Sequence, residues 1–102
     1  MVPVLWHLEV GNVLAQAERR GRIAAGDIAA RIELLRRLPI TTDDETAGRA
    51  LRDTLALARE HKLTTYDASY LELATRCGLP LATRDRELQE AAGRMGVEII
   101  PV

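Results

Sequence analysis

The chain has 102 residues, of which 47% are hydrophobic and 28% are charged, and its formal net charge is −1. This composition is typical of one folded domain and excludes a disordered chain. The net charge excludes a large basic field that would bind polyanions without selectivity, and the single cysteine excludes an intrachain disulfide framework. No apolar run approaches the roughly 18 residues of a membrane span, and no basic leader precedes an apolar segment at the start, so we expect one cytoplasmic domain over residues 1–102.

The first part of the chain predicts two helices. Apolar residues recur at helical spacing over residues 6–20, and Gly21 ends that helix. A second helix is expected to begin at Asp27, a natural N-cap, and to stop before Pro39. Residues 2–5 are short and apolar, which predicts either a brief buried strand or the lead-in to the first helix.

A short strand is predicted at residues 40–42, followed by a third helix. Asp43 or Asp44 is expected to cap this helix, which carries apolar residues such as Leu51 at helical spacing and ends in a basic run. Asp43, Asp44 and Glu45 form an acidic group, and the positive end of the helix dipole explains it without any function.

Helices and strands alternate in the remaining sequence. A helix over residues 65–76 ends at Gly78, an apolar strand follows at 79–83, and a last helix at 86–95 precedes a terminal strand at 97–102. Strands separated by helices predict an α/β fold, with a parallel sheet covered on both faces and connected by right-handed crossovers.

Glu9 and Asn12 are polar residues within an otherwise apolar helix, and their i, i+3 spacing places them on one face. A carboxylate is costly to bury without a cation, a base or a water-filled cleft beside it. The alternative is a surface glutamate paired with a basic residue. At this point both interpretations remain open.

Asp67 shares a helical face with Leu71, and we expect that face to point inward, while Glu72 and Arg76 are expected on the outer side of the same helix. An inward carboxylate needs a partner. The alternative is a capping box, because Thr64 and Asp67 have the required spacing.

Asp85 directly follows the predicted strand at residues 79–83. The carboxyl ends of parallel strands are where open α/β sheets place their ligand crevices. Asp85 is also a natural N-cap for the last helix, and the two roles can coexist. Thr83 either directs its hydroxyl into the same crevice or fills a strand position.

Three carboxylates at the ends or inner faces of elements, Glu9, Asp67 and Asp85, suggest a site for a hard cation. Mg²⁺ and Mn²⁺ prefer carboxylate oxygens and retained water. Such a site suggests metal-assisted hydrolysis of a phosphodiester bond, and no serine or cysteine nucleophile with a histidine partner competes with it. Cys77 is expected to be a small core residue.

Three segments resemble motif blocks of VapC-like toxins in the PIN-domain ribonuclease family, and they follow the family's order and spacing. They are PVLWHLEVGNVL (residues 3–14), LTTYDASYLELA (63–74) and GLPLATRD (78–85). The resemblance implies that Glu9, Asp67 and Asp85 are catalytic metal ligands. It also implies that the following residues border the site: Asn12, Tyr66, Tyr70, Thr83 and Arg84.

The same resemblance implies a three-layer α/β/α fold and a Mg²⁺- or Mn²⁺-dependent endoribonuclease that acts on RNA and is inhibited by a VapB-like antitoxin. The chain departs from the family's pattern at its start, because the usual first, central strand with its acidic residue and the helices after it are absent. We therefore expect a partial PIN domain. The alternative is a weak or inactive remnant that acts as a dimerisation or antitoxin-binding module.

Two structural predictions follow. The carboxylates of Glu9, Asp67 and Asp85 are expected to converge at one edge of the sheet. A sheet without its central strand would expose unpaired backbone groups, so we also expect a homodimer or larger homo-oligomer, with the helix at residues 6–20 near its interface.

Overall fold

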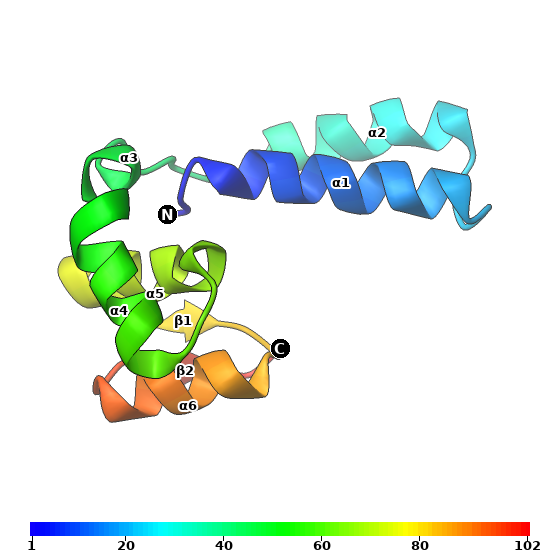
Figure 1. Ribbon diagram of the computed structural model, residues 1–102. Helices are drawn as coiled ribbons and strands as arrows, with labels where there is room; N and C mark the ends of the chain where they lie inside the picture. Colours follow the sequence, from blue (N-terminus) through cyan, green and yellow to red (C-terminus); the bar gives the residue numbers. More distant parts are fainter. The chain divides into compact units, whose positions relative to one another are not determined.

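The computed structural model describes residues 1–102, which form two compact units (Figure 1). The N-terminal unit is Met1–Thr42 and the C-terminal unit is Asp43–Val102. Each unit is described by itself below. The single domain over residues 1–102 and its three-layer arrangement therefore stay predictions.

The N-terminal unit is a helical hairpin. Helix α1 (Leu5–Arg19) and helix α2 (Ala25–Arg36) run antiparallel in Figure 1. The chain turns between them through Gly21, whose φ of 70° lies in the left-handed region that favours glycine. The predicted first helix is thus confirmed, including the glycine that ends it. Apolar side chains of both helices, with others from the flanking chain, line a groove of about 350 Å³.

Helix α2 begins before the residue that we expected to cap it. Ala24 is the N-cap, and Asp27 occupies the third helical position, where its Oδ2 accepts a hydrogen bond from the Ala24 N–H at 3.1 Å. The prediction of Asp27 as N-cap is therefore wrong. A carboxylate three residues into a helix can reach back to the first unpaired N–H, so the same residue type stabilises the helix start from either position.

The ends of the N-terminal unit meet in a single parallel bridge between Val2 and Thr42. The Val2 N–H donates to the Thr41 carbonyl at 2.8 Å, and His7 Nε2 shares a hydrogen bond of 2.8 Å with Thr42 Oγ1. The strand predicted at residues 40–42 is therefore reduced to one bridging residue. Residues 2–5, predicted as a strand or the lead-in to the first helix, contain one bridging residue and lead directly into α1.

The C-terminal unit opens with a continuous helical segment in three parts: α3 (Thr46–Arg49), the π-helix η1 (Ala50–Thr54) and α4 (Leu55–His61). A π-helical turn contains an extra residue, which rotates the side chains that follow it relative to an uninterrupted α-helix. This break interrupts the predicted apolar row, and Leu51 is 84% exposed.

The start of α3 differs from the prediction as well. Its N-cap is Glu45, which makes no side-chain capping hydrogen bond, so the expectation that Asp43 or Asp44 caps this helix is wrong. The buried carboxylate of Asp43 instead accepts a hydrogen bond of 2.6 Å from the Thr46 hydroxyl. Asp43 precedes the N-cap by two residues, and its carboxylate also accepts a hydrogen bond from the Glu45 backbone.

The rest of the C-terminal unit alternates helices and strands as predicted. Helix α5 (Thr65–Cys77) leads to strand β1 (Leu81–Ala82), helix α6 (Arg86–Arg94) and strand β2 (Ile99–Ile100). The two strands are shorter than predicted but pair in parallel, with Leu81 opposite Ile99. An α/β fold with a small parallel sheet is therefore confirmed.

The core of this unit lies where α5, the strands and α6 meet. Leu71 on α5 is fully buried, as the predicted inward stripe requires, and α6 contributes its apolar face. The core residues are Leu71, Ala74, Leu81, Leu88, Ala91 and Ala92.

Cys77, expected in the core, is exposed because it lies at the last position of α5, where the chain turns outward through Gly78. No helix in the chain combines the length and apolar character needed to cross a membrane.

Candidate metal centre

The first turn of α5 holds Asp67, the second of the candidate carboxylates. Thr64 is the N-cap of this helix, and its Oγ1 accepts a hydrogen bond of 3.1 Å from the Asp67 N–H. This is one half of the predicted capping box. Asp67 itself is half-buried, while Leu71 one turn later is fully buried, so Asp67 lies at the open end of the inward stripe.

Asp85 is the N-cap of α6, as one of the two predicted roles requires. Its Oδ1 accepts a hydrogen bond of 3.0 Å from the Leu88 N–H. The side chain is exposed, and a carboxylate has about four acceptor positions, so capping leaves acceptor capacity for a cation. The capping hydrogen bond also fixes the orientation of the carboxylate, and a side chain that binds a metal needs a fixed orientation.

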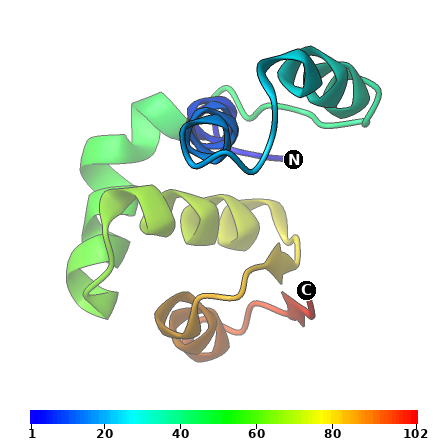
Figure 2. The ribbon, with the colours of Figure 1, turned by 90° about the vertical axis from the view of Figure 1, so that its right-hand side faces the viewer.

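Both aspartates lie at the amino end of a helix of the C-terminal unit. Helix α5 and strand β1 are joined by the short turn at residues 78–80, as Figure 2 shows. Asp67 is in the first turn of α5, and Asp85 begins α6 after β1. Negative side chains are favoured at both positions because helix amino ends carry positive partial charge.

Two neighbours of Asp85 support the turn between β1 and α6. The Asp85 N–H donates to Thr83 Oγ1 at 3.1 Å, and Gln89 Nε2 donates to the Thr83 carbonyl at 2.8 Å. Arg84 is exposed, and its Nε donates to the carbonyl of Val102 at 3.3 Å. Thr83 thus helps to hold the backbone of Asp85.

The two candidate tyrosines are both on α5 but differ in exposure. Tyr66, beside Asp67, is 66% exposed. Tyr70 is half-buried and packs against the core of the C-terminal unit. Tyr66 therefore has a ring face available to a ligand, whereas part of Tyr70 serves the packing of the fold.

Glu9 and Asn12 lie on α1 in the N-terminal unit, and both are exposed. The exposure of Glu9 is compatible with both interpretations, a surface glutamate and a carboxylate beside a cation, a base or a cleft. The convergence of Glu9 with Asp67 and Asp85, which belong to the other unit, stays a prediction.

A buried ion-pair network, which the sequence did not predict, lies on the opposite side of α5 from its apolar stripe. Arg76 Nη2 donates to Asp43 Oδ2 at 2.8 Å, and Arg76 Nε donates to Glu72 Oε1 at 2.7 Å. Both carboxylates are buried, so the expectation that Glu72 and Arg76 occupy the outer side of the helix is wrong. Their i, i+4 spacing is a signal for an ion pair, but nothing in the sequence indicates Asp43 as the third member.

The network shifts the protonation equilibria of its members. The hydrogen bond from Arg76 is the largest cause that lowers the pKa of Asp43 from 3.8 to about 2. Glu72, followed by Asp43, raises the pKa of Arg76 further above its ordinary value. Arg49 extends the network, with ion pairs to Glu45 at 3.3 Å and to Glu72 at 3.7 Å.

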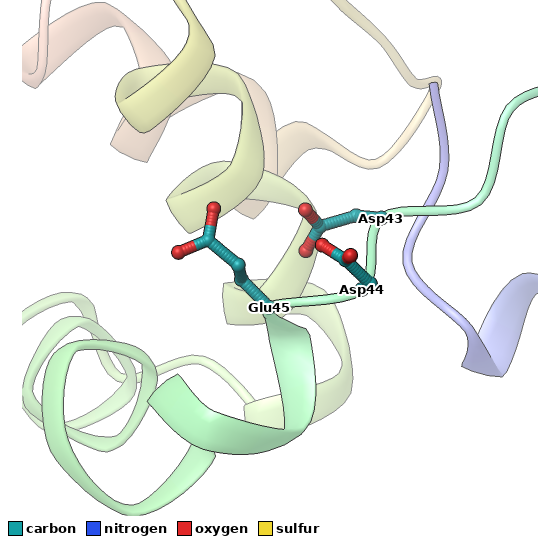
Figure 3. A group of neighbouring side chains, drawn as sticks. All are labelled: Asp43, Asp44 and Glu45. Carbon is teal, nitrogen blue, oxygen red and sulfur yellow. The ribbon is translucent and has the colours of Figure 1, made fainter.

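Asp43, Asp44 and Glu45 bring three carboxylates together at the start of α3, as Figure 3 shows, with ligand atoms within 4.8 Å of one another. Arg76 contacts two of them, Asp43 at 2.8 Å and Glu45 at 3.2 Å. Arg76, together with Arg49 at Glu45, therefore already offsets part of their negative charge. We assign this group to the ion-pair network and not to a metal site.

Comparison with known proteins identifies the family. The PIN domain family matches residues 1–94, which include most of both units. Ribonuclease VapC3 of Pyrobaculum aerophilum is 35% identical over 82 residues, which are 80% of this chain and 63% of that protein. Exonuclease VapC9 of the same organism is 37% identical over 95 residues, which are 92% of this chain and 68% of that protein.

A third relative is Ribonuclease VapC3 of Mycobacterium tuberculosis, 34% identical over 89 residues, which are 87% of this chain and 62% of that protein. The chain thus spans less than two thirds of the length of either VapC3 protein. No solved structure matches the chain significantly. The family match and these identities show that the chain belongs to the PIN domain family and is VapC-like.

Proposed function

We propose that this protein is a metal-dependent endoribonuclease that hydrolyses phosphodiester bonds of RNA. The observation that carries the proposal is the pair of aspartates, Asp67 in the first turn of α5 and Asp85 at the N-cap of α6, in a member of the PIN domain family. Glu9 is proposed as the third carboxylate. The ribonuclease names of two relatives support the choice of RNA as substrate.

The proposed ligands suit Mg²⁺ or Mn²⁺, because all three are carboxylates and the set contains no sulfur or imidazole donor. Asp85 is exposed and keeps acceptor capacity beyond its cap, and Asp67 is half-buried. When bound, the cation supplies a lowered pKa for an attacking water and offsets charge on the phosphate and the leaving oxygen.

The remaining side chains of the site would bind and orient RNA. Arg84 places a guanidinium group beside Asp85, where it can donate to a phosphate oxygen. The exposed ring of Tyr66 offers a face on which a base can stack. Asn12 is proposed to orient Glu9 or a phosphate, and Thr83 holds the backbone that presents Asp85.

The purified protein is expected to cleave a circular RNA in the presence of Mg²⁺ or Mn²⁺ and to lose this activity in EDTA. A circular substrate has no ends, so its linearisation requires an endonuclease, and gel electrophoresis separates the two forms. Cleavage of linear RNA alone would assign an exonuclease, the activity named for one relative. Undiminished cleavage in EDTA would contradict the metal site.

We also propose that the protein acts in the cytoplasm as the toxin of a toxin–antitoxin pair, with a VapB-like antitoxin as partner, in line with its VapC relatives.

A homodimer is proposed because the C-terminal unit exposes a large apolar side chain, Leu51, on its first helical segment. Isolated leucines are ordinary on surfaces, but one this exposed is available for association.

Light scattering over a micromolar concentration series is expected to give the mass of a dimer. Leu51→Gln should shift the equilibrium toward monomer if the exposed leucine lies in the interface. Leu34→Gln serves as a control, since Leu34 is 61% exposed on α2. A monomer at every concentration would contradict the dimer.

A further inference from the structure

The N-terminal and C-terminal units carry charges of opposite sign. Residues 1–42 contain six arginines and four acidic residues, a net charge of +2, whereas residues 43–102 contain eight basic and eleven acidic residues, a net charge of −3. Two of the three proposed metal ligands, Asp67 and Asp85, thus belong to a unit whose net charge repels a polyanion. Cationic groups elsewhere on the chain, in addition to Arg84, would therefore favour the binding of a polyanion.

Three of the six arginines gather at the turn of the hairpin. Arg19 is the last residue of α1, Arg20 is its C-cap and Arg22 follows Gly21, and we call these three arginines the turn cluster. All three are exposed. The positive φ of Gly21 reverses the chain between Arg20 and Arg22, so the arginines surround one tight turn.

The turn cluster is not explained by internal ion pairs. The arginine ion pairs of this protein belong to Arg49 and Arg76 in the C-terminal unit. Asp27, the acid at the start of α2, forms no ion pair with these arginines. Its carboxylate accepts a hydrogen bond from the Ala24 N–H. The negative end of the α1 dipole favours Arg19 and Arg20, but Arg22 lies beyond the helix.

We propose that the turn cluster binds the phosphate backbone of RNA. Every basic residue of the hairpin is arginine, and arginine's planar fork matches phosphate oxygens in pairs, which the compact charge of lysine does not. A contact with phosphates reads no bases, so it strengthens RNA binding without selecting a sequence. This inference rests on the proposed function for its choice of RNA as the polyanion.

The test measures binding without cleavage. Fluorescence anisotropy in EDTA would give the affinity of the protein for a labelled single-stranded oligoribonucleotide over a series of KCl concentrations. The variant Arg20→Gln/Arg22→Gln is compared with Arg52→Gln/Arg59→Gln, which removes the same charge from exposed positions of the C-terminal unit. Thermal unfolding checks that both variants are folded.

Removal of two phosphate contacts is expected to weaken RNA binding about tenfold at low salt. It should also reduce the slope of the logarithm of the association constant against log[KCl] by about 1.4. The control variant should change neither the affinity nor the slope. If the double variant does not fold, Arg22→Gln, outside both helices, should reduce the slope by about 0.7.

Three results would overturn the proposal. One is equal affinity of the turn-cluster and control variants. Another is unchanged RNA affinity with weakened binding to polyglutamate, which would assign the cluster to an acidic protein segment. The third is a wild-type protein that does not bind RNA. A wild-type protein that binds RNA without cleaving it contradicts the proposed function alone, and the binding comparison then still decides this inference.

Discussion

Asp85→Asn is expected to reduce metal-dependent RNA cleavage by about 1,000-fold while leaving the fold intact, because a metal ligand contributes several kcal/mol to such a reaction and each 1.36 kcal/mol is tenfold in rate. Asparagine has nearly the shape of aspartate and is an equally good N-cap, so it can still accept the Leu88 N–H that starts α6. What it lacks is the negative charge that holds a hard cation. Single-turnover cleavage of labelled RNA, with thermal unfolding in parallel, measures both effects.

The matched control is Asp44→Asn, which makes the same chemical change in the acidic group at the start of α3. Asp44 is exposed, and its neighbours Asp43 and Glu45 already pair with Arg76. Cleavage should stay within about twofold of wild type, since exposed substitutions away from a site have small effects. If Asp44→Asn abolishes cleavage and Asp85→Asn does not, the metal site lies at the start of α3 and our assignment is wrong.

Arg76→Met is expected to lower the free energy of unfolding by about 3 kcal/mol, because removal of one partner leaves buried charges uncompensated. Methionine keeps the length of the aliphatic stem, so the loss reports the guanidinium group. Its removal leaves the carboxylates of Asp43 and Glu72 buried without their main cation. Urea unfolding followed by circular dichroism measures the change.

The control for Arg76→Met is Arg59→Met, because Arg59 is exposed on α4 and belongs to none of the network's ion pairs. Its unfolding free energy should change by less than about 0.5 kcal/mol. Equal effects of the two substitutions would show that the buried network does not stabilise the fold.

The network also predicts how stability depends on pH. The pKa of Asp43 is lowered from 3.8 to about 2 in the folded protein. A lowered carboxyl pKa stabilises the fold fully above the unfolded value, and this contribution is lost as the pH falls from about 4 through 2. In Arg76→Met the pKa of Asp43 should return toward or above its ordinary value. Urea midpoints between pH 5 and 2 should then fall less steeply for the variant than for wild type.

The sequence alone determined several features that depend on neighbouring residues, although the caps predicted at Asp27 and at Asp43 or Asp44 were wrong. Thr64 and Asp85 were recognised as helix caps, and the structure shows both, because a cap joins groups only three residues apart. The alternation of helices and strands after Thr64 was predicted for the same reason, since each element shows its own apolar periodicity. The three segments that resemble PIN-domain toxins also placed the chain in the family that comparison shows.

Only the tertiary structure decided which helical faces are buried and which distant residues meet. Helix α5 has two inward faces, an apolar one at Leu71 and a charged one at Glu72, and a pattern of hydrophobicity reveals only the first. Asp43 and Arg76 are 33 residues apart, and their hydrogen bonds exist because the start of α3 packs beside α5. Long-range pairing depends on how elements pack, and packing is a property of the whole chain that no local spacing encodes.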